Sequence, residues 1–290
     1  MRFLLGKLRR RHIWRRIALE RLTEPLHLNI LSLAVAVFGT FRARVAFDLV
    51  LRQHHAFGLL RAADFARAIG LEAVTAIEFG VANGAGLLNL CEVGCRVTAA
   101  TGVRFEIVGF DTGAGMPVPV DHRDHPEYYR AGDFPMDRRA LDARLPPNAR
   151  VVYGDVAETV PRFLADLSPT APIGFVSLDL DYYQSSRAAL RLLEDPDPRK
   201  YLPVSVMYLD DIAFPGHNEW CGELLAVREF NAENAMRKIG RYAFLRSTRV
   251  FKNPAWLDHM FTLQVLDHPE RQPEGARTAR ERIVLENPYF

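Results

Sequence analysis

The sequence predicts an α/β domain in which helices cover both faces of a doubly wound, mostly parallel sheet of seven strands. From residue 46 onward, short apolar runs alternate with longer segments of helical periodicity. Five of these runs end in an acidic residue or a glycine loop. Two later runs, 242–251 and 259–266, are expected to pair as a hairpin. Ligands of such sheets bind beyond the carboxyl ends of the strands.

The elements follow one another in a regular order. The first helix, 47–70, has apolar residues at helical spacing and stops at Gly70, a common C-terminal signal. The expected strands are 73–80, 104–111, 149–155, 173–181 and 204–211, and the expected helices between and after them are 86–100, 156–167, 185–195 and 222–240. Residues 117–148 form an insertion too long for an ordinary connection, so we expect a lid or a substrate-contacting loop there.

The chain is predicted to have one domain, residues 46–267, between an N-terminal extension (1–45) and an irregular tail (268–290). Residues 1–21 contain eight Lys or Arg and one acid, Glu20, whereas the whole chain has a net charge of only +2. The apolar run 26–41 is shorter than the roughly 20 residues that span a bilayer. The extension is therefore a structural helix, an arm on a membrane surface, or a spanning anchor or export signal.

The composition also limits which binding partners and which cellular compartment are expected. The three cysteines form neither a disulfide framework nor a zinc motif, which favours the reducing cytoplasm, with peripheral membrane association left open. No aromatic-interleaved basic motif is present, so no nucleic-acid partner is expected. Self-association is compatible with the sequence, which does not specify it.

A glycine loop follows the first expected strand. The stretch "AIEFGVANGAG" places Gly80, Gly84 and Gly86 in the turn before a helix, where backbone N–H groups are free. The spacing differs from the Gly-x-Gly-x-x-Gly of dinucleotide-binding proteins, and a tight strand-to-helix turn would explain it equally. The loop alone is a weak signal.

Acidic residues at three successive strand ends make the loop more specific. Glu78 precedes it, Asp111 ends the second strand and Asp155 follows the third. A carboxylate at the second strand end can accept both hydroxyl groups of a ribose, and further acids favour a cationic ligand over a pyrophosphate. S-adenosylmethionine has a sulfonium charge and no phosphates, so it fits this pattern better than NAD or ATP.

Together, "AIEFGVANGAG", "IVGFDTGAGMP", "YGDVAETVPRFL", "SLDLDYYQSS" and "YLDD" resemble the Rossmann-like class I S-adenosylmethionine-dependent methyltransferases. The resemblance is greatest to metal-dependent, macrocin-type sugar O-methyltransferases and covers residues 44–235. It implies that Glu78, Gly80 and Gly84 line the methionine side, that Asp111 holds the ribose, and that Asp155 and Val156 flank the adenine. The expected cofactor set also includes Val81, Ala82, Thr112 and Asp179.

Two acidic pairs follow the fourth and fifth strands, in "SLDLD" and "YLDD". The resemblance implies a divalent metal held by Asp179, Asp210 and Asp211, with Asp181 as a substitute ligand or a base. Carboxylates brought this close repel one another, and Mg²⁺ removes the conflict because it takes oxygen ligands. The competing interpretations are a helix cap for the first pair, where Ser185 or Ser186 could also serve, and a simple turn for the second.

The sequence therefore predicts an O-methyltransferase acting on a small molecule or sugar hydroxyl, with S-adenosylmethionine and Mg²⁺. His217 is a candidate general base or a surface histidine. His122 and His125 either contact substrate or belong to a solvated lid, and Tyr182 and Tyr183 either wall the acceptor pocket or pack. The alternatives are a metal-dependent glycosyltransferase, suggested by Asp-Leu-Asp, and a non-catalytic interaction module.

Overall fold

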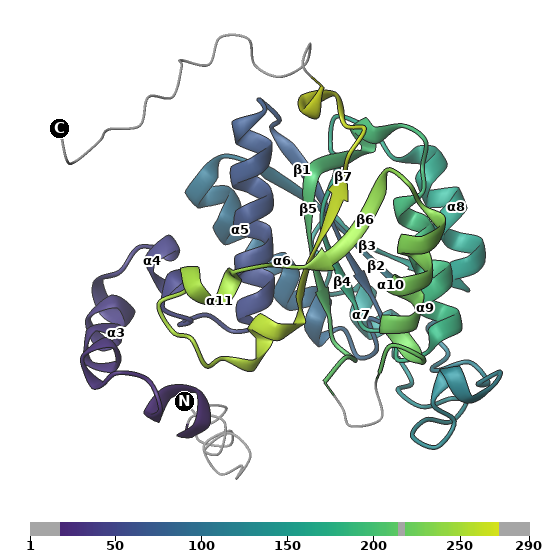
Figure 1. Ribbon diagram of the computed structural model, residues 1–290, viewed down its shortest axis with the longest axis horizontal. Helices are drawn as coiled ribbons and strands as arrows, with labels where there is room; N and C mark the ends of the chain where they lie inside the picture. Colours follow the sequence, from purple (N-terminus) through teal and green to yellow (C-terminus); the bar gives the residue numbers. More distant parts are fainter. Residues whose placement is uncertain (1–17, 214–217, 273–290) are drawn as a thin grey trace.

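A seven-stranded sheet crosses the centre of the computed structural model, which describes residues 18–213 and 218–272 (Figure 1). The strand order is β3-β2-β1-β4-β5-β7-β6. In chain order the strands are β1 (Ala73–Phe79), β2 (Arg104–Asp111), β3 (Ala149–Tyr153), β4 (Ile173–Leu178), β5 (Tyr201–Leu209), β6 (Arg237–Arg241) and β7 (Met260–Val265). The first five pair in parallel, and β7 pairs antiparallel with both β5 and β6, so the sheet is mixed.

The central strand β1 determines where a ligand can bind. It pairs with β2 on one side and β4 on the other, so the chain order reverses between β1 and β4. At such a switch point the flanking loops diverge and leave a crevice at the carboxyl edge of the sheet. Both faces of β1 are buried, which explains its nearly continuous apolar sequence.

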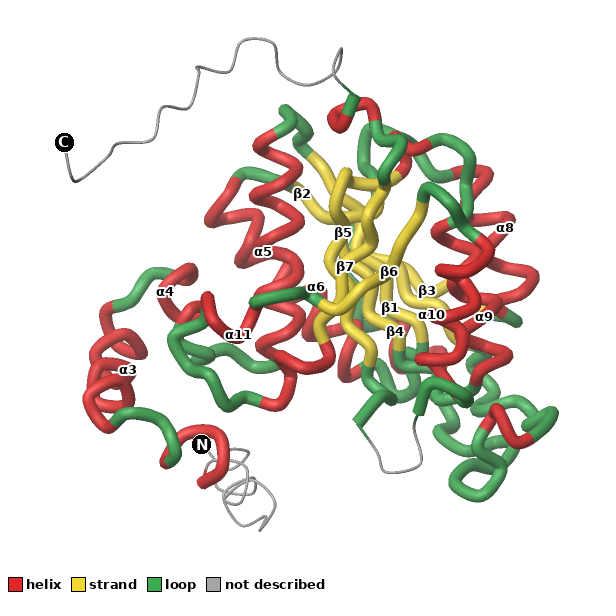
Figure 2. Tube along the Cα trace, in the orientation of Figure 1, coloured by secondary structure: helices red, strands yellow, loops and turns green. Residues whose placement is uncertain are grey.

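Helices cover the two faces of the sheet and enclose two apolar cores (Figures 1 and 2). On one face lie α5 (Gln53–Ala68) and α6 (Ala85–Thr101), and on the other lie α8 (Val156–Asp166), α9 (Tyr183–Leu190) and α10 (Gly222–Glu233). The remaining α-helices are α3 (Leu26–Phe38), α4 (Phe41–Ala46), α7 (Arg138–Asp142) and α11 (Leu245–Thr248). Glycines with left-handed backbones, Gly84 and Gly102, bound α6 at its two ends.

The N-terminal helices join the domain near the expected boundary at residue 45. Val45, at the end of α4, belongs to the apolar core, and the Arg96 guanidinium lies 4.7 Å from the centre of the Phe41 ring. Helix α4 thus packs on the sheet domain, whereas α3 lies apart from it (Figure 1). None of the described helices is both long enough and apolar enough to cross a membrane.

Two sequence expectations near the C-terminus were wrong. The helix expected over 222–240 ends at Glu233, and residues 237–241 form the edge strand β6. The strand expected over 242–251 is instead a turn followed by the short helix α11. The hairpin exists, but it pairs β6 with β7. The other expected strands and helices are present with shifted ends.

Candidate active site

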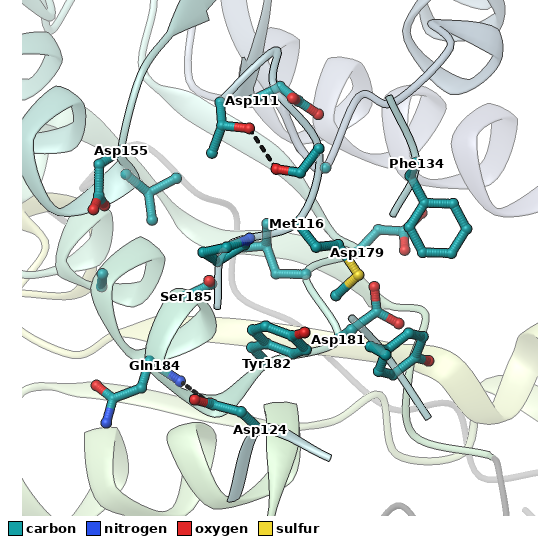
Figure 3. Close-up of a pocket in the computed structure, with 18 of the residues that line it drawn as sticks. Asp111, Met116, Asp124, Phe134, Asp155, Asp179, Asp181, Tyr182, Gln184 and Ser185 are labelled. Carbon is teal, nitrogen blue, oxygen red and sulfur yellow. Dashed lines mark hydrogen bonds between the residues drawn. The ribbon is translucent and has the colours of Figure 1, made fainter. Parts of the chain in front are cut away.

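A cavity of about 890 Å³ opens at the carboxyl edge of the sheet, where β1, β2, β4 and β5 end (Figure 3). The insertion forms one wall and the loops after the strands form the other. Of the residues predicted from the sequence, the cavity is lined by Gly80, Ala82, Asp111, Thr112, Asp155, Val156, Asp179, Asp181, Asp210 and Asp211. Glu78, Val81 and Gly84 lie behind this surface, and His217 falls outside the described residues.

The glycine loop is held against the end of β4. Gly80 has a φ of 80°, and a Cβ there would lie 1.8 Å from the carbonyl oxygen of Asp179, so only glycine fits. The Asp111 carboxylate accepts hydrogen bonds from the backbone N–H groups of Val81 and Ala82, both at 2.9 Å, and of Gly113 at 2.6 Å. Asp111 therefore fixes the loop after β1 while also lining the cavity.

Glu78 lies beneath this loop rather than in the cavity. A Cβ on Gly86 would lie 1.9 Å from Glu78 Oε1, so glycine at the start of α6 makes room for the carboxyl group. Burial raises the pKa of Glu78 to about 8, with Asp179 and Asp111 adding to the shift and Arg52 opposing it. Its Oε2 has no hydrogen-bond partner among the residues that the structure describes.

Residues on the expected adenine side of the cavity also stabilise the fold. The Asp155 side chain accepts a hydrogen bond from Ala157 N at 2.8 Å and caps α8. Val156 packs into the core beside it while still lining the cavity. On the neighbouring loop, the Thr112 hydroxyl donates to the Gly115 carbonyl at 2.7 Å.

Three carboxylates meet where β4 and β5 end. One carboxylate oxygen from each of Asp179, Asp210 and Asp211 lies within 4.8 Å of the others. Backbone pairing produces this arrangement, because Asp210 N donates to Leu178 O at 3.0 Å and keeps the loop after β5 in register with β4. The donor set is all oxygen, which is the set that Mg²⁺ prefers.

The cluster is electrostatically unfavourable without a cation. The pKa of Asp179 is raised to about 8, chiefly by burial and also by the nearby like charges of Asp210 and Asp181. Burial and the neighbouring aspartates raise the pKa of Asp211 to about 9. A bound divalent cation would remove this repulsion and favour the ionised carboxylates.

Asp181 has different partners from Asp179. Its backbone is left-handed, with a φ of 51°, and its N–H donates to Asp211 Oδ2 at 3.1 Å. Its side chain is hydrogen-bonded to Asp211 and to the hydroxyl of Tyr129, a residue of the insertion. Burial raises the pKa of Asp181, which makes it a stronger base than an ordinary aspartate.

The insertion also caps the helix that follows β4. Asp124 is buried, and its carboxylate accepts from Val120 N at 2.9 Å and from Gln184 N at 3.0 Å in the first turn of α9. The side chains of Asp179 and Asp181 therefore do not serve as the cap that the sequence had offered as an alternative. Figure 3 shows Asp124 beside Gln184, below Tyr182.

Two further residues support the cluster from behind, and sequence reasoning missed both. Glu223, fully buried at the start of α10, accepts from Asp211 N at 3.2 Å, and burial and the aspartates raise its pKa well above the ordinary value. Tyr208 donates its hydroxyl to Asp210 Oδ1 at 2.7 Å, and its ring stacks on His54. Tyr208 belongs to the quoted motif "YLDD" and Glu223 to the helix expected over 222–240, but nothing in the sequence showed their contacts.

The two histidines of the insertion have different environments. His122 is exposed to solvent, as expected for a residue of a solvated lid. His125 is buried instead, close to Gly222 at the start of α10, where its Nε2 would lie 3.1 Å from an added Cβ. Tyr182 is buried and lines the cavity, whereas Tyr183 packs into the core and donates to Glu229.

The similarity of this chain to known proteins is found among solved structures. No family model matches the sequence, and no protein with curated annotation matches it. The solved structures found to be similar are methyltransferases, which is the class that the sequence motifs resemble.

Three of these structures illustrate the similarity. CalS11, a calicheamicin methyltransferase, is 25% identical over 71% of this chain and 83% of its own, with a TM-score of 0.46. TomG of Streptomyces achromogenes, an O-methyltransferase solved with S-adenosylmethionine, is 15% identical over 79% of this chain and 89% of its own, with a TM-score of 0.38. MycE, solved with Mg and S-adenosylhomocysteine, is 14% identical over 71% of this chain and 46% of its own, with a TM-score of 0.36.

Proposed function

We propose that this protein is an S-adenosylmethionine-dependent O-methyltransferase that uses a divalent cation, with Mg²⁺ as the expected ion. The observation that carries the proposal is a single cavity joining two half-sites. One half is the glycine loop with Asp111, and the other is the cluster of Asp179, Asp210 and Asp211. A cofactor in the first half would therefore lie next to an acceptor held at the second.

The first half-site has the features that a positively charged nucleoside needs. Gly80 lets the backbone come close, and Asp111 lines the cavity with a carboxylate that can accept from ribose hydroxyls. Val156 offers an apolar surface for a base. S-adenosylmethionine, when bound, would supply an activated methyl group on sulfur. The aspartates around the cavity match its sulfonium charge better than they match a diphosphate.

The second half-site fits a divalent cation. Asp179, Asp210 and Asp211 would hold it, while Tyr208 and Glu223 keep Asp210 and Asp211 in place. The cation would act as a Lewis acid that lowers the pKa of an acceptor hydroxyl group.

Residues of this chain would carry the proton and shape the pocket. Asp181, beside Tyr129, would receive the proton of the acceptor hydroxyl, because a raised pKa favours proton uptake by its carboxylate. Holding acceptor and methyl donor in one cavity supplies the alignment that methyl transfer needs. The insertion forms one wall of this cavity.

The cavity walls suggest the kind of acceptor. The insertion contributes mostly apolar side chains, namely Pro117, Val118, Val120 and Phe134, and Met116 directly before it adds another. The opposite wall is acidic. We therefore propose a small molecule or sugar-bearing compound that presents a hydroxyl group to the aspartates and an apolar surface to the insertion.

Calorimetric titration tests the proposal. S-adenosylmethionine should bind the full chain, and Mg²⁺ should bind to the chain with the cofactor present. D211N should lose at least tenfold in Mg²⁺ affinity and retain S-adenosylmethionine binding, because Asp211 lies in the second half-site only. D166N, at an exposed position in the last turn of α8, is the matched control and should behave like the wild type.

Other results would favour the alternatives. Binding of a UDP-sugar with Mg²⁺, and not of S-adenosylmethionine, would support the glycosyltransferase suggested by Asp179-Leu180-Asp181. If neither S-adenosylmethionine nor the UDP-sugar binds, the result would support a non-catalytic module. Equal Mg²⁺ affinity in D211N and wild type would exclude the assigned metal site.

A further inference from the structure

Helix α3 presents an apolar face that no described part of the chain covers. Leu26, Ile30, Leu33 and Val37 follow one another at helical spacing and are between 60% and 74% exposed. Phe38, at the end of the helix, is 86% exposed. Figure 1 shows α3 at the side of the molecule, away from the sheet and its covering helices. An exposed patch of this kind marks an interaction surface.

The polarity of α3 is the reverse of that of an ordinary surface helix. Its one buried residue is Ser32, whose hydroxyl donates to Asn29 O at 2.6 Å. The Asn29 amide also points back to the chain and donates to Arg21 O at 2.9 Å. Polar groups are thus satisfied on the inner side while large apolar groups face outward. This arrangement is unfavourable in water and favourable against an apolar phase.

The helix is held in place at both ends, so its orientation is fixed. Before it, the buried Glu24 carboxylate accepts from Asn253 N at 2.6 Å, and Arg21 donates to Phe47 O at 2.9 Å. After it, Arg42 in α4 forms a 2.6 Å ion pair with Asp64 in α5. The apolar face is therefore presented by the folded domain and is not the side of a loose arm.

Length and charge indicate what covers this face. At 13 residues, α3 is about 20 Å long, which is too short to span a hydrocarbon core of roughly 30 Å. It contains no Asp, Glu, Lys or Arg, while residues 1–21 carry eight Lys or Arg and one acid. We propose that α3 lies in the surface of an anionic lipid bilayer, with the basic segment bound to the headgroups.

The same charges disfavour the main alternative, a second copy of this chain. A two-fold contact through α3 would bring two strongly basic segments toward each other and would be opposed by their repulsion. An anionic lipid surface attracts the same segment. Lipid binding is independent of methyl transfer, so either proposal can fail without the other.

Vesicle flotation tests the lipid proposal with the full chain. Binding to phosphatidylcholine vesicles containing 30% phosphatidylglycerol should be at least tenfold stronger than binding to phosphatidylcholine alone, and high salt should weaken it. L33E should lower binding to the anionic vesicles by about tenfold or more, because it removes a leucine from the apolar contact and adds a negative charge.

The matched control is M236E, which adds the same charge at another exposed apolar position, between α10 and β6. It should retain binding, and both variants should unfold at the wild-type temperature because both positions are exposed. Equal binding of wild type to the two vesicle types, or equal binding of L33E and M236E, would overturn the proposal. A dimer in light scattering that L33E dissociates, without vesicle binding by the wild type, would assign the face to self-association.

Discussion

At the residue scale, neighbouring aspartates have different contacts because their backbone conformations differ. Asp179 follows β4 directly and joins Asp210 and Asp211. Asp181, two residues later, has a left-handed backbone and contacts Tyr129 of the insertion. The sequence places all four acids at strand ends. Strand periodicity could not decide whether Asp181 is a substitute ligand or a base, because alternation of side chains stops where the strand stops.

The Tyr208 hydroxyl should set the metal affinity of the site by orienting Asp210. Y208F removes the hydrogen bond to Asp210 but keeps the ring that stacks on His54. We expect about tenfold weaker Mg²⁺ binding by calorimetry, the usual order of effect for a residue that orients a ligand. Y153F removes a Tyr–Asp hydrogen bond of the same 2.7 Å length outside the cluster and is the control. Equal losses in both variants would refute the role of Tyr208.

Glu78 should make the metal-free protein less stable at high pH. Its pKa is raised from 4.5 to about 8 in the folded state, so between these values the folded protein keeps a proton that the unfolded chain has released. The free energy of unfolding of the wild type, relative to that of E78Q, should therefore fall by about 1.4 kcal/mol per pH unit from pH 4.5 to pH 8. Above pH 8 the difference should become constant.

Urea unfolding at several pH values, in the presence of a chelator, measures this difference. E72Q, at an exposed glutamate before β1, controls for the loss of one carboxylate. A stability difference between wild type and E78Q that is constant over this pH range would show that Glu78 is ionised in the folded protein.

At the element scale, the insertion and the loop after β4 act as one unit. Asp124 ties them together through its bonds to Val120 and to the first turn of α9. Tyr129 adds a second link, to Asp181. The position of the insertion and its unusual length could be predicted from the sequence. Its attachment could not, because an aspartate inside a long loop gives no local sign of the helix that it caps.

Replacing Asp124 should loosen the insertion. D124A leaves two backbone N–H groups without their partner, so we expect a loss of about 2 kcal/mol in the free energy of unfolding. Amide hydrogen exchange should accelerate in residues 117–134 and at Gln184. D137A removes the cap of α7 within the same insertion and should leave exchange at Gln184 unchanged. Unaltered exchange at Gln184 in D124A would contradict the link.

Where sequence reasoning failed for whole elements, tertiary pairing overrode local preference. Residues 234–240 continue a helical composition, yet α10 ends at Glu233. The side chain of Asn231 accepts from Ile239 N at 2.7 Å and donates to the Ile239 carbonyl. This side chain holds β6 at the edge of the sheet. The strands β1, β4 and β5 were predictable because their two buried faces demand apolar, β-branched sequences.

At the scale of the whole molecule, the sheet order brings distant segments to one cavity. The switch between β1 and β4 places the glycine loop beside the aspartates that follow β4 and β5. The carboxyl edge was predictable from the strand pattern, and with it the acidic residues at strand ends that line the cavity, namely Asp111, Asp155, Asp179, Asp181, Asp210 and Asp211. Glu78 lies behind it against Gly86, Val81 packs into the core, and Gly84 packs against Leu141 of α7, none of which residue spacing reveals.

The central claim is that one cavity holds both a nucleoside cofactor and a divalent cation. A crystal structure with S-adenosylhomocysteine and Mn²⁺, with anomalous data collected at the manganese edge, tests it most directly. We predict a manganese peak among Asp179, Asp210 and Asp211, and the adenosine between Asp111 and Val156. A peak elsewhere, or an unoccupied cluster with the nucleoside bound outside this cavity, would contradict the account.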